Sequence, residues 1–160
     1  MVTIRFMGDD DVLAVAELLG KTYRWLGQRE AFTAEQVEFL VSKRGSLECV
    51  SRESRNQLYF VASVRGDIVG MVAVSGNEIT KLYVLPAHHR TGIGTELFAA
   101  AEAVVRGAGY DRLTLGAFRT AVPFYAAMGM SVTGRKPHGR GPLEGLSVTL
   151  MEKELKQGEG

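Results

Sequence analysis

The chain has 160 residues, of which 46% are hydrophobic and 23% are charged, a composition ordinary for a single globular domain with a sizeable core. Its 19 Lys and Arg nearly balance its 18 Asp and Glu, so the formal net charge is only +1. This balance argues against a general nucleic-acid-binding protein, which needs a basic surplus to neutralise phosphates.

Cysteine content and hydropathy indicate the compartment. Cys49 is the only cysteine, so no internal disulfide can form and nothing requires an oxidising compartment. The N-terminal residues lack the apolar run of a secretory signal, and no stretch reaches the roughly 18 apolar residues of a membrane span. We therefore expect a cytoplasmic protein with no membrane or nucleic-acid partner. It should form one domain over residues 1–155, followed by a polar tail at 156–160.

The first third of the chain shows strand and then helix patterns. Val2–Phe6 alternates weakly and is a candidate strand. Asp9–Asp11 offers N-caps and negative charge for a helix that continues to about Trp25. Thr33, with Gln36 three residues later, forms a capping-box pattern and so predicts the start of a second helix.

Three strands are expected next, joined by tight turns, at about residues 58–64, 68–74 and 78–84. The segment 68–74 is apolar on both faces, which favours a strand inside a covered sheet. Pro86 then ends the last strand of this meander.

The second half is expected to contain a helix, a strand, another helix and two strands, at about residues 92–106, 112–115, 117–128, 130–133 and 146–151. Residues 134–145 are rich in Gly, Pro, Arg and Lys, which predicts a mobile loop. The order of elements predicts an α/β domain in which helices cover both faces of a mixed sheet.

The segment from Leu82 to Leu97 holds the strongest functional signal: a strand, a proline, a short loop, two glycines and a helix. The first amides of a helix have no internal partner, and the helix dipole adds positive charge there. Gly92 and Gly94 let an anion approach the backbone closely, and Arg90 adds a positive charge. The pattern predicts a phosphate-binding loop, although glycines in this position can also serve only a tight turn.

Two other phosphate-binding motifs do not fit this loop. Thr95 follows the second glycine, where a Walker loop requires Lys. Leu97 occupies the position where a dinucleotide-binding fingerprint requires its third glycine.

The run His89-Arg90-Thr91-Gly92-Ile93-Gly94 resembles the pyrophosphate motif of the GNAT superfamily of N-acetyltransferases. That motif is Gln or Arg, two variable residues, Gly, one variable residue, and Gly or Ala, so His89 departs from it. Residues 121–130 resemble the late helix of the family, commonly Ala-x-x-Phe-Tyr followed by a small turn. Phe118 stands where many members have Asn, so a polar contact to the cofactor is missing or replaced.

This resemblance implies the GNAT (acyl-CoA N-acyltransferase) fold: a mixed, mostly antiparallel, twisted sheet of six to seven strands flanked by about four helices. It implies acetyl-CoA as co-substrate and direct attack by an amine of a small molecule or, as a second choice, of a protein or peptide. A non-catalytic CoA-binding or regulatory module is the alternative, and a homodimer stays open. The positions implied for cofactor binding are Leu82, Tyr83, Val84, His89, Arg90, Thr91, Gly92, Ile93, Gly94, Thr95 and Phe118.

The resemblance also implies two catalytic residues. Glu78 matches a general base that deprotonates the acceptor ammonium, and strand alternation predicts that it shares a face with Leu82 and Val84, together with Thr80. Tyr125 matches the proton donor to the departing thiolate, since tyrosine stays protonated at neutral pH. The alternatives are a solvent-facing glutamate and a core aromatic side chain.

Two further groups are candidates for the acceptor site. Residues 23–26 at the end of the first helix either shape the acceptor pocket or pack in the core, which is the more ordinary role of Trp25. Arg135, Lys136, His138 and Arg140 either attract an acidic acceptor or form a solvated surface. No His or Cys cluster has the spacing of metal ligands, so no metal is expected.

Overall fold

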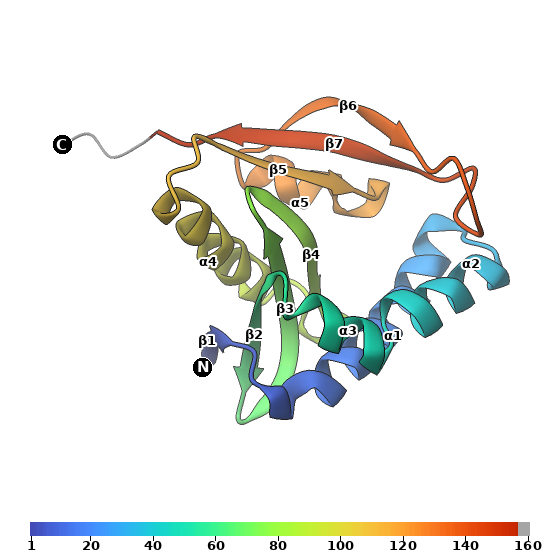
Figure 1. Ribbon diagram of the computed structural model, residues 1–160, viewed down its shortest axis with the longest axis horizontal. Helices are drawn as coiled ribbons and strands as arrows, with labels where there is room; N and C mark the ends of the chain where they lie inside the picture. Colours follow the sequence, from blue (N-terminus) through green and yellow to red (C-terminus); the bar gives the residue numbers. More distant parts are fainter. Residues whose placement is uncertain (157–160) are drawn as a thin grey trace.

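Seven strands form one twisted sheet in the computed structural model, which describes residues 1–156 (Figure 1). They are β1 (Val2–Phe6), β2 (Leu58–Val64), β3 (Asp67–Ser75), β4 (Glu78–Val84), β5 (Arg112–Ala117), β6 (Ser131–Pro137) and β7 (Ser147–Glu154). Their order in the sheet is β1-β2-β3-β4-β5-β7-β6. All neighbours are antiparallel except β4 and β5, which are parallel, so the predicted mixed sheet is confirmed.

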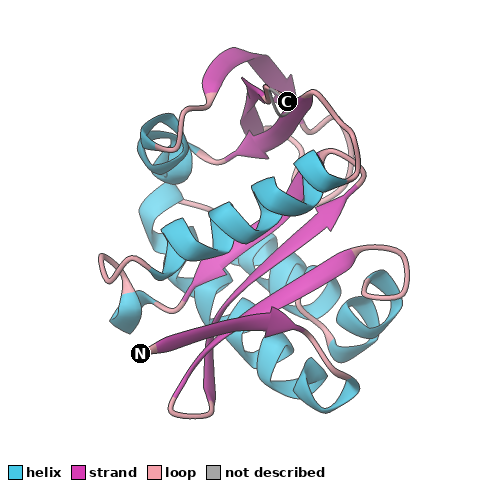
Figure 2. Cartoon of the chain, turned by 90° about the vertical axis from the view of Figure 1, so that its left-hand side faces the viewer, coloured by secondary structure: helices cyan, strands magenta, loops and turns pink. Residues whose placement is uncertain are grey.

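Within residues 1–156, five α-helices cover the two faces of the sheet (Figure 2). They are α1 (Val12–Glu30), α2 (Ala34–Phe39), α3 (Leu47–Glu53), α4 (Ile93–Gly107) and α5 (Val122–Ala127). A π-helical turn, Leu40–Arg44, extends α2. None of the helices in the described part of the chain is long and apolar enough to cross a membrane.

The sheet separates two hydrophobic clusters. On one face α4 and α5 contribute buried side chains such as Leu97 and Tyr125. On the other face α1 and α3 contribute side chains such as Leu19 and Val50. Strand β3 supplies both clusters alternately and is buried along most of its length, as predicted for a strand that is apolar on both faces.

The first helix is longer than predicted, since α1 continues past Trp25. Gly27 lies in this additional part of the helix and has a role in packing. A Cβ atom on Gly27 would lie 2.5 Å from Val37 Cγ2, so the glycine lets α2 approach α1 closely. The predicted capping box before α2 is confirmed. The Thr33 N–H donates to Gln36 Oε1 (2.9 Å), and the Gln36 N–H donates to Thr33 Oγ1 (3.1 Å).

Helix α3 was not predicted. The Cys49 N–H donates to Ser46 Oγ at 3.1 Å, which caps the helix at its start. Cys49 and Val50 are buried, so this short helix presses one side against the sheet. The cysteine is a free thiol buried in the core.

Two predictions in the second half are corrected. The helix expected from residue 117 begins only at Val122, because Ala117 still pairs with Thr149 of β7. The mobile loop expected over 134–145 is also wrong in part, because β6 continues to Pro137 along β7. Leu143, further along, is buried in the cluster that contains α1.

Candidate active site

Strands β4 and β5 separate after a short stretch of pairing. Only Glu78↔Thr114 and Ile79↔Leu115 are paired, and beyond them β4 runs toward the start of α4 without β5 beside it (Figure 1). The hydrogen bonds to β3 decide which β4 groups are left open. The Leu85 N–H donates to Val69 O (2.8 Å), and hydrogen-bonded pairs alternate with non-bonded ones in antiparallel strands.

The backbone N–H and C=O groups of Leu82 and Val84 therefore point away from β3, into the gap left by β5. Tyr83 has its backbone directed to Met71 of β3, and its side chain lies on the face covered by α1. The gap thus offers the Leu82 N–H and C=O and the Val84 N–H to an extended ligand, whereas the Val84 carbonyl oxygen is bound by His89 Nε2. Of the three β4 positions proposed for cofactor binding, two present backbone groups and one presents only a side chain.

The loop after β4 leads into the bare start of α4. Gly92 has φ +85° and precedes the helix without any side-chain hydrogen bond to the first-turn amides. Arg90 also has positive φ, +63°, so the chain turns sharply here. Ile93 is buried and contributes only its amide, and Thr95 is exposed in the first turn. Free amides at a helix start can bind an anion, so the structure leaves the predicted anion site available.

Gly94 has a role in packing. A Cβ atom at this position would lie 3.3 Å from Cε1 and Cζ of Phe124, so the glycine lets α4 and α5 come together. At Gly92 a Cβ would meet no atom within 4 Å, so only the backbone conformation calls for glycine there. The two glycines of the motif therefore answer two different physical requirements.

His89, which departs from the family motif, supports the loop from its side. Its Nε2 lies 2.8 Å from the Val84 carbonyl oxygen, and since a carbonyl only accepts, Nε2 is the donor. The ring also contacts Trp25 edge-on, with centroids 4.8 Å apart. The loop is thereby tied to both β4 and α1, and Trp25 lies beside the anion site, where a purely core position was the expected one.

Tyr125 lies in α5, buried beside Phe98 and Phe124 with ring centroids 6.3 and 5.2 Å away. Burial raises the pKa of Tyr125 above its ordinary value of 10.0, and Tyr83 adds to this effect. The hydroxyl therefore stays protonated over the whole physiological range and can donate a hydrogen bond. Tyr125 is therefore a core aromatic ring whose hydroxyl can still donate a hydrogen bond. Its role as proton donor to the departing sulfur stays a prediction.

The predicted face of Glu78 is corrected by a β-bulge. Ala73 pairs with Lys81 and Val74 pairs with Ile79, so Thr80 is an extra residue in β4. The bulge reverses the alternation, and Glu78 shares the face of Lys81 and Tyr83 rather than that of Leu82 and Val84. This is the face toward α1 and α3, and the Glu78 side chain is exposed on it.

A buried polar cluster on the same face was not predicted. The Lys81 ammonium forms an ion pair with Glu53 of α3, and Glu53 also accepts from the Tyr59 hydroxyl (2.9 Å) and from Cys49 Sγ (3.3 Å). Burial opposes the ionisation of Glu53, but hydrogen bonds and charge attraction from Lys81 outweigh it and lower its pKa. The cluster fixes α3 to β4. Because its pKa is lowered, Glu53 is a weaker base than an ordinary glutamate.

Phe118 contacts the end of α1 instead of presenting a polar group. Its ring lies 5.2 Å from that of Phe32, nearly edge-on. The next two residues also contact the end of α1. The Thr120 N–H donates to a carboxylate oxygen of Glu30 at 2.6 Å, and Arg119 lies 3.8 Å from the same carboxylate. The turn after β5 is therefore held against α1, across the opening of the sheet.

The remaining candidates fall into separate places. Tyr23 and Leu26 are buried, whereas Arg24 is exposed. His138 is half-buried, and burial together with the charges of Arg44 and Lys136 lowers its pKa. No cluster of three His, Cys, Asp or Glu that could hold a metal occurs within residues 1–156.

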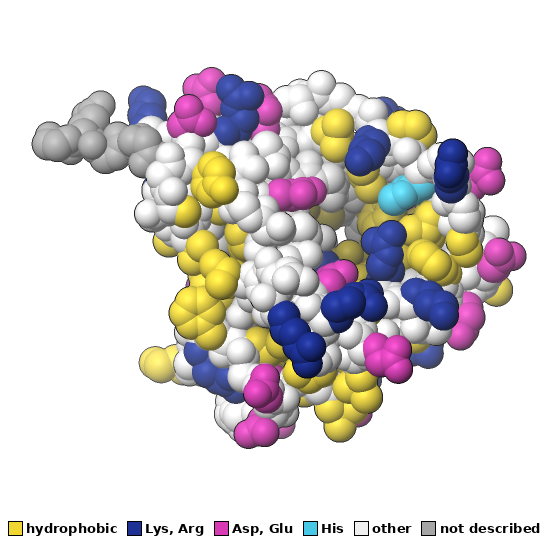
Figure 3. All heavy atoms as spheres, viewed as in Figure 1, with side chains coloured by type: hydrophobic (Ala, Val, Ile, Leu, Met, Phe, Trp, Pro, Cys, Tyr) yellow, Lys and Arg dark blue, Asp and Glu magenta, His cyan; other side chains and the backbone are white. Residues whose placement is uncertain are grey.

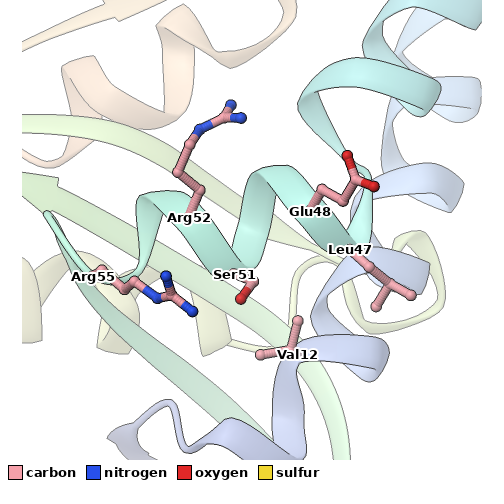
Figure 4. Close-up of a pocket in the computed structure, with 6 residues that line it drawn as sticks. All are labelled: Val12, Leu47, Glu48, Ser51, Arg52 and Arg55. Atoms are coloured by element: carbon pink, nitrogen blue, oxygen red, sulfur yellow. The ribbon is translucent and has the colours of Figure 1, made fainter.

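A separate depression lies on the outward side of α3 and is unrelated to this site (Figure 4). It is lined by Val12, Leu47, Glu48, Ser51, Arg52 and Arg55. Helix α3 itself lies between this depression and β4, because Cys49 and Glu53 point from the other side of the helix to the sheet.

Residues 28–155 match the family described as "Acetyltransferase (GNAT) domain". The chain therefore belongs to the GNAT acetyltransferase family. A GCN5-related N-acetyltransferase from Rhodopseudomonas palustris is similar over 96% of this chain and 95% of its own, with 26% identity and a TM-score of 0.87. The family fold predicted from the sequence is confirmed.

Two other solved structures share the fold. The PaiA N-acetyltransferase from Thermoplasma acidophilum, in complex with coenzyme A, is 20% identical over 96% of this chain and 99% of its own, with a TM-score of 0.77. The acetyltransferase YncA from Salmonella typhimurium, with its cofactor acetyl-CoA, is 19% identical over 100% of this chain and 97% of its own, with a TM-score of 0.73.

Proposed function

We propose that this protein is an N-acetyltransferase that transfers the acetyl group of acetyl-CoA to a primary amine by direct attack. One observation carries the proposal: the backbone groups that β4 leaves open, the Leu82 N–H and C=O and the Val84 N–H, lead directly to the bare helix start at Gly92. An extended pantetheine arm requires such a strip of backbone partners, and a pyrophosphate requires such a helix start. The complexes of PaiA with coenzyme A and of YncA with acetyl-CoA support the same ligand for this chain.

In this proposal the amine nitrogen bonds to the thioester carbonyl carbon and the carbon–sulfur bond breaks. The Val84 N–H stabilises the negative charge that develops on the carbonyl oxygen. The Tyr125 hydroxyl donates its proton to the departing sulfur, which would otherwise leave as a thiolate. The acceptor ammonium loses one proton to Glu78 through water before it attacks. After the attack the nitrogen loses a second proton, which restores the Tyr125 hydroxyl. The products are an N-acetylated amine and free CoA.

The acceptor of first choice is a small-molecule amine, with a protein or peptide amine as the second choice. Incubation with acetyl-CoA and a panel of amines tests the reaction through the appearance of the free CoA thiol. A non-catalytic CoA-binding module is favoured by one observation, the contact of Phe118 with Phe32 where a polar cofactor contact was expected. Binding of CoA without thiol release across a broad panel would support that module.

Replacement of Glu78 by Gln should lower the rate about tenfold or more, because proton removal by a positioned side chain contributes at least this much. The loss should be greatest at low pH, where the unprotonated amine is scarcest. The measurement is kcat/KM between pH 6 and 9 for both proteins. A pH–rate profile that is identical in shape and height for Glu78→Gln would remove the assignment of the base.

A further inference from the structure

Three separate segments meet beside Tyr83, on the face of β4 covered by α1. Tyr83 of β4 lies against Tyr23 of α1, with ring centroids 5.5 Å apart. The turn that ends at Arg44 is pressed onto α1, because a Cβ atom on the next residue, Gly45, would lie 3.4 Å from Tyr23 Cε2. Leu143 of the β6–β7 connection is buried in the same cluster as Tyr23.

Arg44 is exposed, and it directly precedes Gly45, which packs against Tyr23. Its guanidinium lies 5.8 Å from the ring centroid of Phe39, and within residues 1–156 it forms no ion pair or hydrogen bond. The positive charge of Arg44 acts on three neighbouring groups. It lowers the pKa of Tyr23 and Tyr83, which burial raises, and it lowers the pKa of His138.

Within residues 1–156, no carboxylate forms an ion pair with Arg44. Besides burial, the groups that act on the pKa of Tyr23, Tyr83 and His138 are Arg44, Lys136 and other tyrosines. Figure 3 shows a hollow in the surface with Lys, Arg and His side chains, and an acidic side chain, at its rim. An exposed guanidinium without a carboxylate partner can bind an anionic group.

Position distinguishes Arg44 from other arginines. Arg5, Arg106 and Arg112 form ion pairs with carboxylates. Arg65 is exposed, like Arg44, and lies in the β2–β3 turn. Arg44 alone among these five contributes to the pKa of Tyr23, Tyr83 and His138.

We propose that the acceptor amine carries an oxyanionic group, a carboxylate or a phosphate, and that Arg44 binds this group. The proposal rests on the proposed acetyl transfer, in which the amine approaches the thioester from the Tyr83 side of β4. A guanidinium binds carboxylate and phosphate with two parallel hydrogen bonds, and so fixes the orientation as well as the charge of the acceptor. Arg44 then selects amino-acid-like acceptors over neutral amines.

The test compares matched acceptors of increasing length: ω-amino carboxylates, ω-aminoalkyl phosphates and the alkylamines of equal length. Wild-type protein should favour one of the anionic series over the alkylamines by at least about tenfold in kcat/KM, and the preferred anion distinguishes carboxylate from phosphate. Arg44→Gln should lower kcat/KM for the anionic acceptors by about 10- to 100-fold, the range expected for lost charged hydrogen bonds. The alkylamines should stay within twofold.

Arg44→Lys should recover part of the loss, because it keeps the charge without the paired hydrogen bonds, and Arg65→Gln should change neither series. Equal losses for anionic and neutral acceptors, or a wild-type preference for alkylamines, would overturn the inference. If no amine is acetylated, the proposed function fails and the inference is judged by binding alone. Ligand-observed NMR on CoA-loaded protein then decides, since equal binding of ω-amino carboxylates to wild type and Arg44→Gln contradicts it.

Discussion

Tyr125→Phe should lower kcat by about 100-fold while the KM for acetyl-CoA stays nearly constant. The substitution removes only the hydroxyl, and with it the proton that the departing sulfur requires, a contribution typical of general acid catalysis. The ring and its contacts with Phe98 and Phe124 are kept, so the fold should be unaffected. Steady-state kinetics by thiol release, with a rapid-mixing experiment to identify the chemical step, measure this effect.

The matched control is Tyr110→Phe, which removes a hydroxyl from an exposed tyrosine three residues after α4 and should leave kcat within twofold. The raised pKa of Tyr125 gives a second expectation for wild type. Since a raised pKa keeps the donor protonated below it, ionisation of Tyr125 should cause no loss of rate as the pH rises from 8 to 10. Full turnover by Tyr125→Phe, with chemistry rate-limiting, would refute its role.

Gly92→Asp should weaken CoA binding by at least about 100-fold, whereas Gly92→Asn should weaken it by less than about tenfold. Both side chains tolerate the positive φ of this residue, and a Cβ there meets no atom within 4 Å. They differ in charge. Two like charges 4 Å apart at an effective dielectric constant of about 20 repel by about 4 kcal/mol, which is more than 100-fold in affinity.

Calorimetric titration with CoA measures the difference between the two variants. The thermal midpoint of each serves as the control for folding, and Asp should not lower it relative to Asn, because negative charge is favourable at a helix start. Equal affinities of the Asp and Asn variants for CoA would show that no phosphate lies beside Gly92.

The parts of the fold that depend on local signals could be predicted from the sequence. The capping box at Thr33, the three strands of the meander and the helix after Gly92 are each specified by residues within a few positions of one another. The anion-binding loop belongs to this class, because a strand, two glycines and an amphipathic helix follow in immediate succession.

Features set by distant contacts could not be predicted. The bulge at Thr80 arises from pairing with β3, so the face of Glu78 cannot be read from β4 alone. Helix α3 is short, and its signal was limited to Ser46 at the cap and the buried pair Cys49 and Val50. A lysine is ordinarily exposed, and the burial of Lys81 depends on its ion pair with Glu53, which the same helix α3 supplies.

The exposed edge strand β6 shows the same limit from another side. Its residues are nearly all exposed, and Arg135 and Lys136 give it the composition of a loop. Charged residues on an edge strand discourage pairing with a second chain, so the composition that conceals the strand also protects it. Arg44 was not singled out in the sequence, because only the packing of three segments gives its charge a role.

The central claim is that the amides at the start of α4 bind the pyrophosphate of CoA. Calorimetric titration of the wild-type protein with CoA and, separately, with pantetheine, which has the same arm but no pyrophosphate, tests it most directly. We predict that CoA binds at least about 100-fold more tightly than pantetheine, because several charged hydrogen bonds are lost with the phosphates. Equal affinity for the two compounds, or no binding of CoA at high protein concentration, would contradict the account.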